Sequence, residues 1–94
     1  MVNAIVLIDC VKGSINQTAE ALANLVGVSE VYSVAGRTDL VAMIRVNDND
    51  QLAEIITSKM LLIPGIVKSE TLIAFRVFSK HDLESMFSIG LEQG

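Results

Sequence analysis

The first ten residues after the initiator methionine, VNAIVLIDCV at 2–11, are apolar on both of their alternating sets of side chains. A β-strand turns successive side chains to opposite faces of its sheet, so a strand with this pattern is buried on both faces. The sets are Val2, Ala4, Val6 and Ile8 on one face, and Ile5, Leu7 and Val11 on the other. The fold must therefore cover both faces of the sheet that contains this strand.

An amphipathic helix is predicted over residues 14–26, where apolar side chains recur at helical spacing. Ser14 and Gln17 have the spacing of a capping box, in which each side chain bonds to a backbone N–H of the first turn. Gly27 follows as the expected C-terminal stop.

A second amphipathic helix is predicted over 49–61, after the run Asn-Asp-Asn-Asp at 47–50, whose side chains make good N-caps. Pro64 and Gly65 end it. Three further stretches are rich in apolar and β-branched residues and predict strands at 28–35, 40–46 and 66–78.

The predicted order is βαββαβ, with equivalent helix-to-strand junctions at 26–28 and 64–66. Two βαβ halves of this kind predict an α+β, ferredoxin-like fold at 1–78, with an antiparallel sheet in the order 4-1-3-2 and two helices on one face. A short C-terminal helix is predicted within an extension at 79–94, from Ser79 and Asp82 through Leu83, Met86 and Phe87. Because helices cover only one sheet face, a sheet-to-sheet homodimer is the simplest cover for the other.

Composition supports a self-associating protein, since hydrophobic residues make up 51% of only 94 residues. The formal net charge of −4 argues against a nucleic-acid surface, and no apolar run approaches the roughly 20 residues of a membrane-spanning helix. The start of the chain lacks the basic segment of a signal peptide, and the single cysteine, Cys10, is expected to pack in a strand. These features predict a cytoplasmic protein without direct nucleic-acid or membrane contacts.

The loop between the two middle strands, Val34–Asp39, combines a permissive glycine with a carboxylate three residues later. Gly36 suits a tight reversal of the backbone, and Asp39 supplies an acceptor beside it. Two interpretations remain open at this point. The loop is either a plain hairpin whose Asp39 satisfies a turn N–H, or a site that holds the polar end of a small zwitterion.

Several short motifs, taken in order and spacing, resemble the effector-binding and oligomerisation (RAM) domain of the Lrp/AsnC transcriptional regulators over residues 2–78. They are Gly-Val at 27–28, Val-Ala-Gly-Arg-Thr-Asp-Leu at 34–40, the acidic helix start at 48–50, Ile-Pro-Gly-Ile at 63–66 and Ser-Glu-Thr at 69–71. The resemblance implies a ferredoxin-like fold, a sheet-packed homodimer and rings of dimers, commonly octamers or decamers. It also implies amino-acid effectors in clefts between dimers, without a metal or other cofactor.

The resemblance implies that the ligand-binding residues lie in the loop and in the last strand. They are Gly36, Arg37, Thr38, Asp39, Thr71 and Ile73. We expect Asp39 to accept from the effector's α-ammonium group, with backbone N–H groups near Gly36 and the Thr71 hydroxyl holding its carboxylate. Thr38 stands where the family often has an aromatic residue. In the 4-1-3-2 order, Asp39 and Thr71 of one subunit lie apart, so a shared pocket would combine residues of neighbouring subunits.

The first strand begins at Val2, which leaves no room for the family's helix-turn-helix domain, so a stand-alone, non-catalytic module is expected. One alternative is a small dimeric ferredoxin-like enzyme of the monooxygenase or isomerase type. Against it, the only histidine is His81, and no metal-ligand cluster, phosphate-binding glycine loop or activated nucleophile is evident. A second alternative is a pure interaction module that co-assembles with a full-length regulator of the same family.

Overall fold

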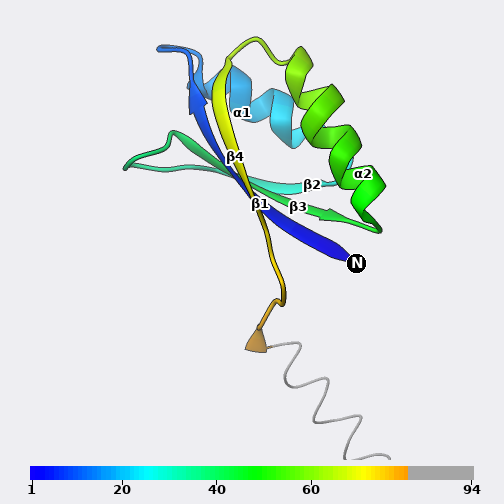
Figure 1. The fold of residues 1–94 in the computed structure, drawn as a ribbon. Helices are drawn as coiled ribbons and strands as arrows, with labels where there is room; N and C mark the ends of the chain where they lie inside the picture. Colours follow the sequence, from blue (N-terminus) through cyan, green and yellow to red (C-terminus); the bar gives the residue numbers. More distant parts are fainter. Residues whose placement is uncertain (81–94) are drawn as a thin grey trace, which may run out of the picture.

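The computed structural model describes residues 1–80 and shows the predicted βαββαβ order (Figure 1). The strands are β1 (Val2–Cys10), β2 (Val28–Ser33), β3 (Leu40–Val46) and β4 (Ile66–Ile73), and the helices are α1 (Ile15–Ala23) and α2 (Asn49–Glu54). All strand pairs are antiparallel, and the sheet order is β2-β3-β1-β4. Both helices cover the same face of the sheet in Figure 1, which confirms the α+β fold class. The predicted C-terminal helix, including His81, lies outside the described residues.

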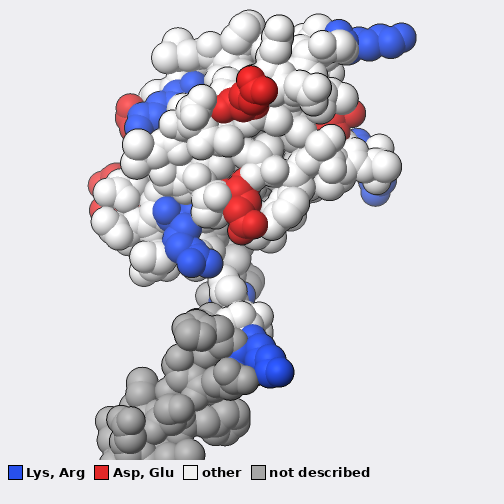
Figure 2. Space-filling model, turned by 180° about the vertical axis from the view of Figure 1, so that it is seen from behind, with Lys and Arg blue, Asp and Glu red and all other residues white. Residues whose placement is uncertain are grey.

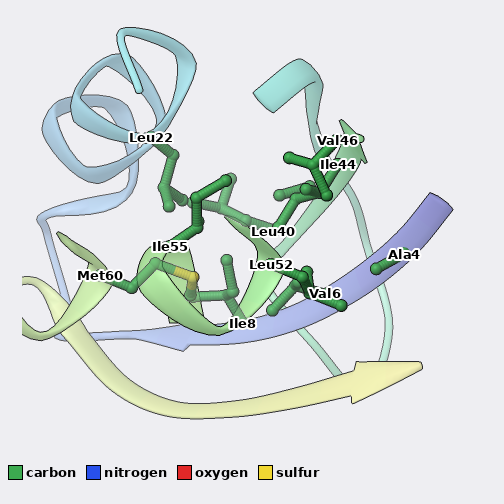
Figure 3. Close-up of a cluster of buried hydrophobic side chains, with 11 residues drawn as sticks. Ala4, Val6, Ile8, Leu22, Leu40, Ile44, Val46, Leu52, Ile55 and Met60 are labelled. Carbon is green, nitrogen blue, oxygen red and sulfur yellow. The ribbon is translucent and has the colours of Figure 1, made fainter. Parts of the chain in front are cut away.

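The hydrophobic core lies between that face of the sheet and the two helices (Figure 3). Alternate residues of β1 and β3 point into it, as the period of a strand requires. The helices add Leu22 from α1 and Leu52 from α2. The strand residues of the core are Ala4, Val6, Ile8, Leu40, Ala42, Ile44 and Val46.

Helix α1 differs from the prediction at both ends. The Ser14 side chain makes no cap bond to the first turn, and its hydroxyl instead donates to the Val11 carbonyl, 2.7 Å away. The predicted capping box is therefore wrong, because the loop before the helix offers this hydroxyl a nearer acceptor. The helix ends at Ala23, and a turn leads to Gly27, which adopts φ +99° directly before β2.

Helix α2 begins as predicted, since the Asp48 side chain accepts a 2.8 Å hydrogen bond from the Gln51 backbone N–H. After Glu54 the helix continues as a π-helical turn, Ile55–Lys59, and closes with a 3₁₀ turn, Met60–Leu62. A π turn bonds each residue to the fifth one along, so Ile55 and Met60 both reach the core.

Strand β4 ends at Ile73, five residues before the predicted limit of Phe78. Its partner is β1, and the pairing ends where Ala4 lies opposite Ile73 and the Ala74 N–H donates to the Asn3 carbonyl. Because β1 itself begins at Val2, the apolar residues beyond 74 have no strand to pair with, and they leave the sheet (Figure 1).

The sheet face away from the helices, here called the outer face, is apolar at its centre. Residues that lie opposite each other in the register share a face, so Ile5 groups with both Met43 and Leu72. The apolar residues of the outer face are Ile5, Leu7, Tyr32, Val41, Met43 and Leu72. No helix or strand in the described part of one copy covers this face, as the sequence analysis predicted.

Within the described residues, no helix has the length and apolarity needed to span a membrane.

Candidate functional site

The loop that joins β2 and β3 extends over six residues, Val34–Asp39, and its ends are held by a 3.1 Å hydrogen bond from the Val34 N–H to the Asp39 carbonyl. Gly36 lies at the exposed tip with φ +148°, a conformation that favours glycine. Apart from Gly36 itself and its two chain neighbours, no described residue has an atom within 4 Å of the position a Cβ would take there. The glycine therefore shapes the loop by its backbone freedom, and no tight contact requires it.

The far end of this loop is fastened to the end of β1. The Ile8 carbonyl accepts from both the Thr38 hydroxyl at 2.8 Å and the Asp39 N–H at 3.0 Å. One carboxylate oxygen of Asp39, Oδ2, accepts from the Cys10 N–H at 2.8 Å. Asp39 thus extends the β1–β3 ladder by a side chain, and one of its two oxygens is already engaged before any ligand arrives.

Replacing Asp39 with alanine is expected to destabilise the fold by about 1.5–3 kcal/mol, since a partly buried charged acceptor is lost. The Cys10 N–H would also be left without its partner. Urea unfolding followed by circular dichroism measures the change. Asp39→Asn keeps an acceptor oxygen at the same place and should retain most of the stability. Equal losses in the two variants would contradict this role of the hydrogen bond.

Cys10 donates its backbone N–H to this contact, and its side-chain thiol is not activated as a nucleophile. Burial raises the pKa of Cys10, and the negative charge of Asp39 raises that pKa further. A thiol with a raised pKa stays protonated at neutral pH, whereas the thiolate is the reactive form. Cys10 therefore acts as a packing group on the helix-covered side of β1.

An open polar hollow of about 520 Å³ lies where the loop meets the edge of the outer face. Its walls come from the loop (Arg37 and Thr38), from β1 (Leu7 and Asp9) and from β4 (Lys68 and Glu70). In the β1–β4 register, Asp9 lies opposite Lys68 and Leu7 opposite Glu70. The hollow therefore unites two carboxylates and two cations on one face of the sheet, and its volume falls in the range of small-molecule sites.

The structure separates the predicted site residues into two groups. Arg37 and Thr38 line the hollow, and Asp39 lies next to it on the chain. Thr71 and Ile73 lie opposite Val6 and Ala4, so they belong to the helix-covered face of the sheet. Within one copy, Thr71 and Ile73 therefore do not face the hollow that contains Arg37 and Thr38.

The strand residues of the hollow, Asp9, Lys68 and Glu70, were not among the residues predicted from the sequence. A signal for them existed, because Asp9 continues the alternating set of Ile5 and Leu7, and Lys68 and Glu70 alternate in the last strand. Their meeting depends on the register between β1 and β4, which includes an irregularity at Asp9 and Cys10. An alternating pattern shows which residues of one strand share a sheet face, but it does not predict which residues of the neighbouring strand lie opposite them.

Comparison with known proteins gives one consistent family. The model of the Lrp/AsnC ligand binding domain matches residues 3–83. A crystal structure of a protein from Thermus thermophilus is 40% identical, with a TM-score of 0.79, and the match covers 85% of this chain and 100% of that chain.

Two further matches, one in sequence and one in fold, are longer transcriptional regulators, and the chain spans only part of each. An uncharacterized helix-turn-helix-type transcriptional regulator of Pyrococcus abyssi is 32% identical over 59 residues, which are 63% of this chain and 39% of the regulator. The structure of a transcriptional regulator of Neisseria meningitidis in complex with L-Met has a TM-score of 0.74 at 12% identity, which shows the fold alone; the match covers 83% of this chain and 52% of that one. The fold, the loop and the family model agree, and the chain belongs to the Lrp/AsnC family through its ligand-binding domain.

Proposed function

We propose that this protein is a cytoplasmic, non-catalytic module that binds an amino-acid effector and assembles with further copies of itself. The observation that carries the proposal is the hollow beside the Val34–Asp39 loop. A free amino acid presents an ammonium group and a carboxylate a short distance apart. Asp9 and Glu70 offer acceptors for the first, while Arg37 and Lys68 offer donors for the second.

Thr38 and Asp39 contribute to this site mainly by position. Their hydrogen bonds to Ile8 and Cys10 hold the loop against β1, which fixes the backbone that directly follows Arg37. A loop that is held before the ligand binds loses less conformational freedom on binding. Because one Asp39 oxygen is engaged, we assign the effector's ammonium group first to Asp9 and Glu70, with Asp39 in support.

Assembly follows from the outer face. Its central residues, Ile5 and Met43, are only partly buried in one copy, and a second copy packed face to face would remove them from water. The hollow opens on the same face of the sheet, so a second copy would also enclose the effector. Effector binding and assembly would then be linked, because each would change the free energy of the other. We propose a dimer of this kind that assembles further into an octamer or decamer.

The proposal gives the described residues no DNA-binding role. On the face drawn in Figure 2, Lys and Arg lie singly among uncharged and acidic side chains and form no continuous basic patch within the described part of the chain. Nucleic-acid surfaces gather such residues to neutralise successive phosphates. Any DNA contact would have to come from another chain or domain in the same assembly.

Thermal unfolding against a panel of the common amino acids tests the binding claim. A ligand at 100 times its Kd should stabilise the folded protein by about 2.7 kcal/mol, and a domain of this size gains about 4–8 °C in Tm per kcal/mol. At least one amino acid at millimolar concentration is expected to raise the Tm. If no member of the panel changes it, the proposed binding function is wrong.

A further inference from the structure

The charged side chains of the hollow are unusually placed, because they lie together and yet do not pair. Asp9, Arg37, Lys68 and Glu70 line the same hollow, with opposite charges on adjacent strands. Among residues 1–80, none of these four groups forms an ion pair or a side-chain hydrogen bond, although Asp9 and Lys68 lie opposite each other in the register. Two donors and two acceptors therefore remain available to a bound molecule.

The main-chain groups of an amino acid satisfy only half of this set. Its ammonium group pairs with one carboxylate of the hollow, and its carboxylate pairs with one cation. One cation and one carboxylate of the hollow are left to meet the effector's side chain. The chemistry of that side chain determines whether the remaining cation and carboxylate of the hollow form hydrogen bonds with the effector or are buried without a hydrogen-bond partner.

Side-chain classes differ sharply in this respect. Where a second copy encloses the hollow, an apolar side chain would displace water from the two remaining charges and leave both without hydrogen bonds, which is costly. A side chain with a single charge would attract one of them and repel the other. A carboxamide has a carbonyl oxygen that accepts and an NH₂ group that donates, so it can bond to the cation and the carboxylate together.

We infer that the hollow selects an amino acid with a carboxamide side chain, glutamine or asparagine, over an apolar amino acid of similar size. This inference rests on the proposed function and adds the chemical class of the effector. Arg37 and Lys68 supply the donors, and Asp9 and Glu70 supply the acceptors. Leu7 forms the apolar part of the wall, against which the methylene groups of the effector pack.

Isothermal titration calorimetry with two size-matched pairs tests the selection. Glutamine is compared with methionine, and asparagine with leucine, since the members of each pair are similar in size and differ mainly in side-chain polarity. We expect the amide of at least one pair to bind about 10- to 100-fold more tightly than its apolar counterpart, as expected when charged groups lose their hydrogen-bond partners. Equal or tighter binding of methionine and leucine would overturn the inference and leave the proposed function standing.

Charge-removing variants locate the selection in the hollow. Lys68→Gln and Glu70→Gln each remove one charge from an exposed side chain, so both variants should fold with an unchanged Tm in the absence of ligand. Each is expected to weaken binding of the preferred amide about tenfold and to reduce its advantage over the apolar partner. The matched controls Lys12→Gln and Glu20→Gln change exposed charges that do not line the hollow, and they should bind as the wild type does.

The remaining outcomes are also decisive. If the amide binds but Lys68→Gln and Glu70→Gln bind it as tightly as the controls do, the hollow is not the selective site and the inference is wrong. If these variants instead change the oligomeric state without changing amide affinity, the four charges pair between copies, which also overturns it. Absence of binding by any amino acid would remove the proposed function, and the inference with it.

Discussion

Replacing Gly65 with alanine is expected to destabilise the folded protein by about 3 kcal/mol, at the upper end of the usual cost of overpacking. A Cβ at this position would clash with the Thr18 hydroxyl oxygen and lie 3.0 Å from the Ser14 hydroxyl oxygen. Thr18 is only 2% exposed, so its side chain has little room to move away. Moving the backbone instead would disturb the 2.8 Å hydrogen bond from the Val11 N–H to the Gly65 carbonyl. Thermal unfolding should show a fall in Tm of more than about 10 °C.

A double-mutant cycle with Thr18→Ala separates this clash from other effects of the substitution. Thr18→Ala removes the nearest contact atom and leaves two milder contacts, from the Ser14 hydroxyl oxygen at 3.0 Å and from the Cβ of residue 18 at 3.2 Å. The added cost of Gly65→Ala should therefore fall markedly in the Thr18→Ala background. If the cost is the same in both backgrounds, the contact between these two residues does not explain the glycine.

Replacing Ile5 with lysine is expected to dissociate the proposed face-to-face dimer without unfolding the monomer. Ile5 lies on the central strand β1, and its side chain points to the outer face beside Met43 and Leu72. In a single copy that face meets water, so an ammonium group there remains hydrated. In a face-to-face dimer each copy would bury an unpaired charge, at a cost of about 3–5 kcal/mol, which weakens association more than about 100-fold.

Sedimentation velocity over a range of protein concentrations measures this effect, and circular dichroism confirms that the variant remains folded. The matched control is Asn16→Lys, which places the same charge on the exposed side of α1. The control should assemble as the wild type does. Assembly of Ile5→Lys with unchanged affinity would show that the outer face is not the contact between copies.

The sequence predicted the arrangement of the fold well, because the strongest patterns in it arise from burial. Residues 2–11 are apolar on both alternating sets, which predicted a strand buried on both faces, and the corresponding β1 lies inside the sheet beside β3, where both strands supply the core. The acidic turn before α2 identified its start, which Asp48 caps. Patterns of this kind are local, and they report directly which side of an element meets the core.

The end of β4 could not be read from local sequence. The residues up to Phe78 are as apolar as a buried strand, but a strand also needs a partner along its whole length. The partner, β1, begins only at Val2, so the antiparallel pairing of β4 ends at Ile73. The predicted Ser14 capping box was wrong for a related reason. The folded loop before α1 places the Val11 carbonyl within hydrogen-bond distance of the Ser14 hydroxyl, and local sequence does not show this contact.

The candidate site was predicted only in part, because it combines a local motif with a register between distant strands. The loop sequence indicated Arg37, Thr38 and Asp39, and the structure places all three in or beside the hollow. Lys68 and Glu70 came into the site only through the β1–β4 register. Gly36 lies at the loop tip and Asp39 accepts a hydrogen bond from the β1 backbone, and their contact with the effector stays a prediction.

Native mass spectrometry of the wild-type protein at low micromolar concentration tests the central claim most directly, because it preserves both subunit contacts and bound effector. We propose that another copy covers the apolar outer face and that this contact encloses the charged hollow. The expected result is an even-numbered assembly, with additional mass on each subunit when the effector is present. A stable monomer under these conditions would contradict the account, because the outer face would then need no cover and the hollow would remain open.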